Sequence, residues 1–479
     1  MKNRFNNLNS KEWLPFQKSW FKFSTLENLY RENVRFFMKF DDNENPPNLL
    51  FIGSKTGQEI ITKIANKEKT QLFFEKDIQQ VDKIQFVIFD YLDIITPDIS
   101  VEEYLEIKSN ILQMLKSIQN KIVHRKFVAV FFRNVENDGR YFPFAWDLAK
   151  NLKNALSLKD EKIGCLERNS EITDSKYFQT DETVFYSLYF RNDENSQHDF
   201  NVFDFGYFEN NQQANSNSIS KQQLASWHIL KPKPRNKDEI LHPAKFPEEL
   251  IEMFLPLFSK ESDNVFDPMC GTGSTILSSL QNNRNGYGVE LSEFFNKIAN
   301  DRCNTYLDSN DSNNTDLKFK ILCKDARKIN KTDFPLFDYT ITSPPYWDML
   351  NMKGAEGQAR RKEKGLKLNY SDDTFDLGNI EDFDSFLDEL VEIYFKIITN
   401  LKPGGYFTIV VKNIKKKGKN YPFAWDLSLR LQEKMILLPE VFWLQDDIRI
   451  APYGYFNTWV SNTFHQYCLT FQKPYQTNS

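Results

Sequence analysis

A strand followed by a glycine turn is the first segment of this sequence that could do chemistry. The run VFDPMCGTGST (265–275) is apolar up to Asp267 and then places Gly271 and Gly273 before a helical stretch. Glycine permits tight turns and close approach of the backbone to a ligand, and helix-start amides bind carboxylates or phosphates. Many nucleotide-binding and structural turns share this spacing, so the turn alone indicates no particular ligand.

Acidic residues end the next two expected strands. GYGVEL (286–291) carries Glu290 at its tip, and LCKDAR carries Asp325. An acid at the strand tip after a glycine turn is placed to bind ribose hydroxyls, and a third acid could accept from an adenine amino group. Each acid alone is more often a helix cap, but together they predict a pocket for an adenosine-bearing cofactor. The predicted contacts are Asp267, Pro268, Gly271, Thr272, Gly273, Glu290, Leu291, Asp325 and Ala326.

A rigid turn follows these strands. FDYTITSPPYWDML (337–350) is an apolar strand that runs into Ser343, two prolines, Tyr346 and Trp347. The prolines remove two amide donors and fix the backbone while their carbonyls remain acceptors. Such a turn can accept hydrogen bonds from an exocyclic amino group while an aromatic ring stacks on the base. A bare proline-terminated strand is the plainer interpretation, but the order after the cofactor strands favours a catalytic turn.

The chain repeats itself. FFRNVENDGRYFPFAWDL (131–148) aligns without a gap on VVKNIKKKGKNYPFAWDL (410–427). Upstream, FDY at 89–91 matches FDY at 337–339, and NLLFIGSKTG (48–57) matches NVFDPMCGTG. Three matches in one order indicate a tandem duplication, and β-rich runs alternating with helical stretches predict an α/β fold with a mainly parallel sheet in each copy. PFAWDL itself is expected to start a helix, with its Trp packed on the sheet.

The first copy has lost the chemistry. Phe51 stands opposite Asp267 and Lys55 opposite Gly271, while Ile95, Thr96, Pro97 and Asp98 fall opposite the Ser-Pro-Pro-Tyr turn and Glu75 opposite Glu290. We therefore expect residues 1–200 to be a degenerate copy without cofactor, 201–235 to be a linker around the polar run NQQANSNSISKQQ (211–223), and 236–479 to be catalytic. The two copies are expected to pair about a pseudo-twofold axis, as a homodimer does.

The stretch from about 240 to 479 resembles the DNA amino-methyltransferases of the N4-cytosine/N6-adenine group. FDPMCGTGS resembles their S-adenosyl-L-methionine loop, TSPPYW their catalytic motif, and HPAKFPEELIEMFL (242–255) the segment that closes over the cofactor. The resemblance implies two tandem Rossmann-like methyltransferase folds, the N-terminal one degenerate. It adds His242, Pro243, Lys245 and Phe246 to the cofactor contacts.

The resemblance also implies a mechanism. A base flips out of double-stranded DNA, and its amino group donates to the Ser343 side chain and the Pro344 carbonyl. Pro345 stiffens the turn, Tyr346 stacks on the base, and Trp347 is expected at the pocket wall. Serine before Pro-Pro-Tyr is typical of N4-cytosine enzymes, but adenine N6 stays open, since many serine-type enzymes place the catalytic motif before the glycine loop.

Two basic runs are expected to contact DNA. KGAEGQARRKEKGLKLNY (353–370) and KNIKKKGK (412–419) are strongly positive, whereas the first copy's RNVENDGR (133–140) is balanced. Positive charge confined to the active copy predicts phosphate contacts. The candidates are Arg360, Arg361, Lys362, Lys364, Lys412, Lys415, Lys416 and Lys417.

Composition limits the other possibilities. The net charge is -5, the five cysteines are scattered, and no apolar run is long enough for a membrane span, which predicts a cytoplasmic protein without a metal site. Two alternatives remain: guanine-N2 methylation of RNA, and an S-adenosylmethionine-sensing DNA-binding subunit. No nuclease motif is visible, so a role in restriction or phage defence would need a partner protein.

Overall fold

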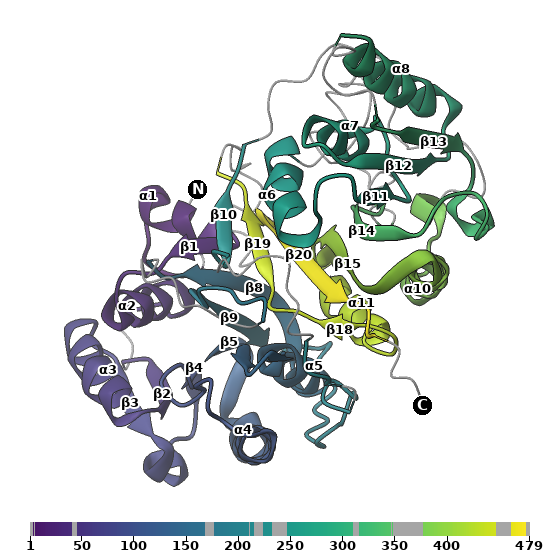
Figure 1. The fold of residues 1–479 in the computed structure, drawn as a ribbon. Helices are drawn as coiled ribbons and strands as arrows, with labels where there is room; N and C mark the ends of the chain where they lie inside the picture. Colours follow the sequence, from purple (N-terminus) through teal and green to yellow (C-terminus); the bar gives the residue numbers. More distant parts are fainter. Residues whose placement is uncertain are drawn as a thin grey trace.

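The computed structural model describes residues 3, 5–40, 46–167, 177–209, 211–214, 224–231, 247–309, 316–345, 347, 377–446 and 461–475. They form two α/β halves that pack against each other (Figure 1). We call the half built on the first sheet the first domain and the half built on the second sheet the second domain.

The first domain is a seven-stranded mixed sheet. Its strands lie in the order β1 (Trp20–Lys22), β8 (Ser157–Cys165), β9 (Val184–Arg191), β5 (Ile122–Phe132), β4 (Ile84–Asp90), β2 (Asn48–Gly53) and β3 (Gln71–Phe74). Only the pairs that involve β9 are antiparallel. The helices are α1 (Ser10–Trp13), α2 (Leu26–Phe37), α3 (Lys55–Lys67), α4 (Val101–Ile118) and α5 (Phe144–Ala155). A separate hairpin joins β6 (Val135–Asn137) to β7 (Arg140–Phe142).

The second domain repeats this strand order. Its sheet runs β10 (Trp227–Ile229), β19 (Val441–Leu444), β20 (His465–Gln472), β15 (Leu401–Val411), β14 (Phe337–Thr342), β11 (Asn264–Asp267), β12 (Asn285–Glu290) and β13 (Phe319–Cys323), and β18 (Ile436–Leu437) pairs with β20. The pairs that involve β20 are antiparallel. The helices are α6 (Glu248–Phe258), α7 (Ser274–Gln281), α8 (Glu293–Ser309), α10 (Phe383–Asn400) and α11 (Phe423–Leu431).

The matching strand orders confirm two tandem α/β folds. In both sheets, one outer strand is followed by an antiparallel pair and then by four parallel strands, in the same order across the sheet. The second domain adds β13 and α8 beyond the strand that corresponds to β3. The hairpin of β6 and β7 also has a counterpart, formed by β16 (Ile414–Lys416) and β17 (Lys419–Tyr421).

The strand register corrects one alignment drawn from the sequence. Phe86 pairs with Phe127, and Tyr339 pairs with Tyr406. Because 127 and 406 are equivalent in the gap-free repeat, Phe86 corresponds to Tyr339, and Asp90 takes the place of Ser343. The FDY match was therefore wrong by five positions, and 90–93, not 95–98, stands opposite the Ser-Pro-Pro-Tyr turn. A three-residue match between two aromatic-rich strands is too short to fix register, whereas an irregularity at the same point in both strands fixes it.

A second match shifts by one residue. Phe51 pairs with Phe74, and Asp267 pairs with Gly288. Extending both strands by one residue places Glu75 opposite Val289 rather than Glu290. The supposed surviving acid of the first copy is thus not the counterpart of Glu290.

Aromatic rings fill the first domain where the second has its glycine loop. Phe51 occupies the position of Asp267, and its ring lies 5.3 Å from that of Tyr30. A methyl group added to Gly57 would lie 2.8 Å from the Phe51 ring and 2.9 Å from the Tyr30 hydroxyl. Tyr30 also donates to Asp90, the residue at the Ser343 position. The space beside the start of α3 is therefore packed with side chains.

The interface between the domains is built twice, by equivalent residues. In one half, Asn134 Nδ2 of the first domain donates to Glu440 at 3.2 Å, and the Tyr186 hydroxyl donates to the same carboxylate at 3.1 Å. In the other, Asn413 Nδ2 of the second domain donates to Glu161 at 2.9 Å, and the Tyr467 hydroxyl donates to it at 3.0 Å. Each domain thus buries a glutamate that the other domain satisfies, as a pseudo-twofold axis requires.

The repeated PFAWDL segment supports this interface. Helices α5 and α11 begin directly after Pro143 and Pro422, which confirms the predicted helix start. The buried Trp of each copy donates its indole N–H to the interface tyrosine: Trp146 to Tyr186 at 2.8 Å and Trp425 to Tyr467 at 3.0 Å. Both copies thus use the tryptophan of this segment to orient the tyrosine that crosses to the other domain.

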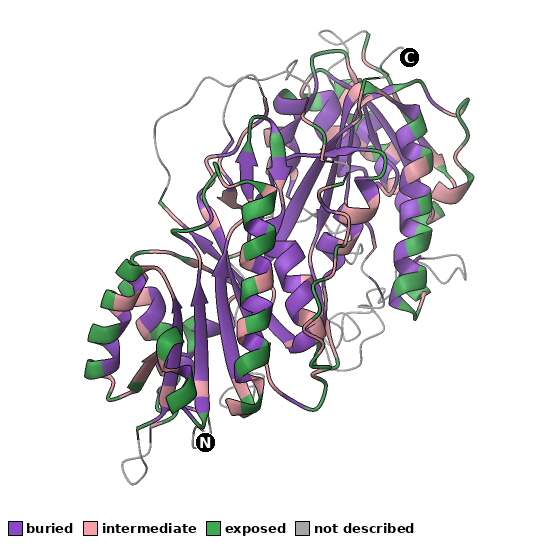
Figure 2. Ribbon diagram, turned by 90° about the horizontal axis from the view of Figure 1, so that it is seen from below, coloured by how far each residue is buried: buried purple, intermediate pink, exposed green. Residues whose placement is uncertain are grey.

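One hydrophobic cluster runs through both domains. It includes Trp146 and Tyr186 from the first domain together with Trp425, Phe442 and Tyr467 from the second. In Figure 2 the strands of both halves are buried over most of their length, and exposed residues gather on the outer faces of helices. The two copies therefore share a core instead of touching at their surfaces.

The segment expected to be a linker is partly built into the domains. The buried Tyr207 donates its hydroxyl to the Trp425 carbonyl at 3.0 Å, and Ala214 N donates to the Gly139 carbonyl at 2.8 Å. Strand β10 belongs to the second sheet. We propose that the true connection lies between Ala214 and Leu224. Within the described ranges, no helix has the length and apolar character needed to cross a bilayer.

The burial of Glu440 leads us to expect that the stability of the fold depends on pH. Burial raises its pKa from an ordinary 4.5 to about 8, against the lowering effect of the Asn134 hydrogen bond. Since the folded-state pKa is raised, this contribution to stability is complete below about pH 4.5 and is lost as pH rises through 8. We expect Glu440→Gln, which keeps an acceptor oxygen, to remove this fall, worth about 1.4 kcal/mol per unit of pKa difference. Urea unfolding between pH 5 and pH 9 measures it; parallel curves for both proteins would contradict it.

Candidate active site

The candidate residues converge on one edge of the second sheet. Strands β14, β11, β12 and β13 are adjacent and parallel, so their carboxyl ends meet at the same edge. Asp267 and Glu290 end β11 and β12, and Ser343 follows β14 directly. Asp325 lies just beyond β13. The sequence motifs thus share the edge where open α/β sheets bind ligands.

Asp267 joins the glycine loop to the catalytic turn. Its buried carboxylate accepts from the hydroxyls of Thr275 and Thr342, both at 2.7 Å, and from Met269 N at 3.0 Å. Thr275 lies in the first turn of α7, and Thr342 is the last residue before Ser343. Burial raises the pKa of Asp267 to about 6, and the hydrogen bonds oppose this rise. The Asp267 side chain therefore links the start of α7 to the end of β14 underneath the carboxyl edge of the sheet.

The glycine loop wraps around the tip of β12. Gly271 has φ 52° and Gly273 has φ 77°, in the left-handed region that favours glycine. Gly271 N donates to Glu290 Oε2 at 2.9 Å, and Ser292 N donates to Oε1 at 2.9 Å. Glu290 is partly exposed at this edge, and a carboxylate is an acceptor for hydroxyl groups. These groups fit a ribose that donates two hydroxyl groups at this edge.

Two residues that the sequence did not single out hold the loop from outside. Arg302 in α8 donates to the Thr272 carbonyl at 2.6 Å and forms an ion pair with Glu248 in α6 at 2.9 Å. Glu248 also accepts from the Ser274 hydroxyl. Glu248 lies inside the HPAKFPEEL segment and could have been suspected from it, whereas Arg302 has no motif around it.

The other acids and thiols have local roles. Asp325 caps a short helix, η5 (Ala326–Lys328), and binds Arg327 Nε at 3.0 Å. Burial raises the pKa of the Cys270 thiol well above its ordinary value, which disfavours the reactive thiolate form. No group of metal-binding side chains occurs among the described residues.

The catalytic turn is fixed at both ends. The Ser343 hydroxyl donates to the Val410 carbonyl of β15 at 3.0 Å. Trp347 is 3% exposed and donates its indole N–H to the Glu381 carbonyl at 3.2 Å. Its ring lies 4.8 Å from Tyr421 and 5.2 Å from Phe383. Trp347 therefore anchors the turn in an aromatic cluster; Tyr346 lies outside the described residues.

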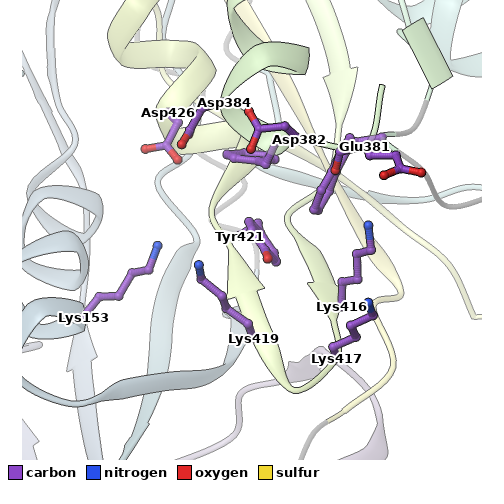
Figure 3. Close-up of a pocket in the computed structure, with 11 residues that line it drawn as sticks. Lys153, Glu381, Asp382, Asp384, Lys416, Lys417, Lys419, Tyr421 and Asp426 are labelled. Atoms are coloured by element: carbon purple, nitrogen blue, oxygen red, sulfur yellow. The ribbon is translucent and has the colours of Figure 1, made fainter. Parts of the chain in front are cut away.

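A groove of about 400 Å³ opens beside Trp347. Figure 3 shows Lys416, Lys417 and Lys419 of the hairpin, with Lys153 of the first domain, across from acidic side chains at the other wall. Lys416 Nζ lies 3.9 Å from the centre of the Trp347 ring, and Lys415 forms an ion pair with Asp160 of the first domain. Burial lowers the pKa of Lys412 to about 8. Of these four predicted DNA contacts, Lys417 at the hairpin tip is the exposed one.

Comparison with known proteins decides the family. The family model N6_N4_Mtase, described as DNA methylase, matches residues 2–301. The chain belongs to this DNA methylase family. The match runs through the first domain, which the sequence motifs alone did not assign to the family, includes the glycine loop, and ends before Ser343.

Curated relatives of this DNA methylase match over shorter stretches. The orphan methyltransferase M.BamHII of Bacillus amyloliquefaciens is 44% identical over 66 residues, which cover 14% of this chain and 25% of that protein. The type II methyltransferase M.BglI of Bacillus subtilis is 29% identical over 126 residues, covering 26% of this chain and 32% of that protein. The alignments thus span a third or less of these relatives.

Solved structures resemble the chain only remotely. The N-methyltransferase NodS of Bradyrhizobium japonicum WM9, in complex with S-adenosyl-L-homocysteine, has a TM-score of 0.31 at 12% identity and covers 50% of this chain and 93% of its own. TrmN of Thermus thermophilus has a TM-score of 0.31 at 10% identity, with 83% and 74% covered. The fold is therefore assigned from strand order. S-adenosyl-L-methionine is the cofactor of the DNA methylase family, and the residues at this edge fit it.

Several predicted site residues of this DNA methylase lie outside the described residues. They are Tyr346 of the catalytic turn, His242, Pro243, Lys245 and Phe246 of the closing segment, and Arg360, Arg361, Lys362 and Lys364 of the first basic run. Pro268, Leu291, Ala326, Pro344 and Pro345 are described and lie at the carboxyl edge with the other candidates.

Two glycines with similar backbone angles give a matched test of the loop. A methyl group on Gly273 (φ 77°) would lie 2.8 Å from Ala299 Cβ, whereas one on Gly418 (φ 75°) would meet nothing within 4 Å. We expect Gly418→Ala to lose about 1–2 kcal/mol of unfolding free energy from backbone strain, and Gly273→Ala to lose at least about 1 kcal/mol more from the clash. Gly273→Ala should also weaken cofactor binding by calorimetry. Equal losses of unfolding free energy in the two variants would contradict this expectation, because they would show that α8 moves away from the added methyl group at no cost.

Proposed function

We propose that this chain transfers a methyl group from S-adenosyl-L-methionine to the exocyclic amino nitrogen of a base flipped out of double-stranded DNA, and that the base is cytosine, methylated at N4. The observation that carries the proposal is the link through Asp267. One buried carboxylate holds Thr275 of the glycine-loop helix and Thr342 before the Ser-Pro-Pro turn. A methyl donor on the loop and an amino acceptor at the turn would thus be fixed against each other.

The turn supplies acceptors for the amino group. Because the Ser343 hydroxyl hydrogen points to the Val410 carbonyl, the oxygen lone pairs stay available to accept from the base. The Pro344 carbonyl is the second acceptor in this proposal, and Tyr346 stacks on the base. Two acceptors on one amino group favour a pyramidal nitrogen with a lone pair free to attack. When bound, the cofactor would supply the methyl group: the new N–C bond replaces the S–CH3 bond, S-adenosyl-L-homocysteine is the leaving group, and the amino group gives up one proton to solvent, so no covalent enzyme intermediate is needed.

The first domain takes no cofactor in this proposal. Phe51 stands at the position of Asp267, and the rings of Phe51 and Tyr30 occupy the space beside Gly57. We propose a non-catalytic first domain up to Ala214 and a catalytic second domain from Leu224; the hydrogen bond from Ala214 to Gly139 and the place of β10 in the second sheet support these boundaries. DNA would approach the groove beside Trp347, with the exposed Lys417 contacting a phosphate. We also propose that the chain acts together with a partner nuclease or defence protein.

The test measures methyl transfer to DNA directly. The full chain is incubated with methyl-labelled S-adenosyl-L-methionine and mixed-sequence duplex DNA, and the nucleosides are then separated by mass spectrometry, with Ser343→Ala as the control. Label in N4-methylcytosine that disappears in the variant supports the proposal. Label in N6-methyladenine keeps the mechanism and overturns the base. Binding of the cofactor without label in DNA overturns the proposed substrate. A parallel incubation with RNA in place of DNA tests the alternative, which label in guanine would identify.

A further inference from the structure

The catalytic turn depends on a hairpin outside the main sheet. Trp347, which anchors the turn, packs on Tyr421 of β17, and Lys416 of β16 lies over its ring. Strands β16 and β17 pair only with each other in the described structure. A two-stranded hairpin is marginally stable by itself. Trp347 is also held by the Glu381 carbonyl and by Phe383, so whatever fixes this hairpin sets a part of the position of Trp347.

The first domain fixes the hairpin through three consecutive charged residues of β8. Lys159, Asp160 and Glu161 are all buried, with exposures of 6%, 2% and 1%. Charged side chains are rarely buried unless they are paired. Their burial in the middle of a strand therefore indicates partners, and these partners lie largely in the second domain.

Each residue of this β8 triplet reaches a different part of the hairpin. Glu161 accepts from Asn413, at its start, at 2.9 Å. Asp160 forms an ion pair with Lys415 in β16 and accepts from Ser461 N at 2.8 Å. Lys159 forms its ion pair within the first domain, with Asp193 at 2.9 Å, and also donates to the Gly418 carbonyl, at the hairpin tip, at 3.4 Å.

Strand β8 has an irregularity next to these charged residues. Its pairing with β9 slips between Leu158 and Asp160, and such an irregularity re-aims side chains on a strand. Glu161 has a pseudo-twofold counterpart in Glu440, but Asp160 falls opposite Pro439, which carries no charge. The link from Asp160 to Lys415 thus exists on the catalytic side alone, next to the intact Ser-Pro-Pro turn.

We propose that Asp160 of the first domain is a positioning residue for the catalytic turn of the second. Through Lys415 it holds the hairpin of β16 and β17, the hairpin holds Trp347, and Trp347 holds the segment that presents Ser343 and Pro344. The non-catalytic copy is therefore a part of the active-site framework. The expected effect of Asp160 on catalysis rests on the proposed methyl transfer. The chain of contacts from Asp160 through Lys415 and the hairpin to Trp347 does not rest on it.

The test compares Asp160→Asn with Asp446→Asn in the full chain. Asp446 forms an ion pair with Lys18 across the same two domains but away from the hairpin, so its loss controls for general loosening. For Asp160→Asn we expect faster hydrogen exchange in 414–421 and in 341–347, about a tenfold lower kcat, and a cofactor Kd within twofold of the unaltered protein. For Asp446→Asn we expect exchange in both segments and kcat to stay within twofold.

A double-mutant cycle of Asp160→Asn with Lys415→Met tests whether the two residues act through the same contact. Because both single variants break the same link, the double variant Asp160→Asn with Lys415→Met should be no slower than the slower single variant. Faster exchange in 414–421 with unchanged exchange in 341–347 and unchanged kcat would overturn the inference, as would parallel losses of kcat and cofactor affinity. If the unaltered chain methylates no DNA, the proposed function fails, and hydrogen exchange alone decides the positioning role.

Discussion

Residues 224–479 produced without the first domain are expected to be insoluble or unfolded and to transfer no methyl groups. Separation would expose Phe442 and Tyr467 of the shared core. It would also leave Glu440 without the hydrogen bonds of Asn134 and Tyr186. A buried polar group left without its hydrogen bonds typically costs about 1–3 kcal/mol, and the exposed apolar surface adds about 25 cal/mol for each Å² returned to water.

The measurement is circular dichroism and sedimentation of the 224–479 fragment, with and without co-expressed 1–214. Co-expression should restore a soluble one-to-one complex and its methyl transfer, because the interface needs no covalent connection. A full chain with a protease site inserted and cut at 217 serves as the control, since it breaks the chain without parting the domains. A 224–479 fragment that is folded, monomeric and as active as the full chain would contradict the expectation and the positioning role of Asp160.

The sequence predicted those parts of the fold that depend on long or chemically constrained patterns. The gap-free repeat around PFAWDL identified two copies of one fold, because eighteen residues fix both register and helix start. The carboxyl-edge cluster of Asp267, Glu290 and Ser343 could be placed because parallel strands always bring their ends together. The match at FDY failed because three residues in an aromatic strand carry little information about register.

Other features had no local signal in the sequence. Nothing around Glu161 or Glu440 indicates that each is satisfied by the opposite domain, because the partners are hundreds of residues away and are neutral amides and phenols. The contact of the lysines after β15 with DNA stays a prediction. Lys415 and Lys416 contact Asp160 and Trp347, and counting charges in a sequence gives no sign of such contacts between the domains.

Replacing Ser343 with alanine is expected to lower kcat for methyl transfer about 100-fold while the Kd of S-adenosyl-L-methionine stays unchanged. The change removes one acceptor for the target amino group, and losing one positioned hydrogen-bonding group in an active site typically costs a factor of about 100–1,000. Cofactor binding should persist because Asp267, Glu290 and the glycine loop do not contact the Ser343 side chain in the described structure. Single-turnover transfer to DNA and calorimetric cofactor binding measure the two effects separately.

Two variants tell the chemical role of Ser343 apart from a structural one. Ser343→Thr keeps both the hydroxyl acceptor and the donor to the Val410 carbonyl, so it should retain most of the transfer rate that alanine loses. Asp90→Asn changes the equivalent position in the first domain, where the side chain binds Tyr30 and Leu92 N instead of facing an open turn. This variant should therefore leave transfer unchanged. A large loss of transfer in Asp90→Asn, in a protein of unchanged stability and unchanged hydrogen exchange in 414–421, would contradict the assignment of the chemistry to Ser343 alone, because Asp90 accepts from Tyr30 and Leu92 N within the first domain.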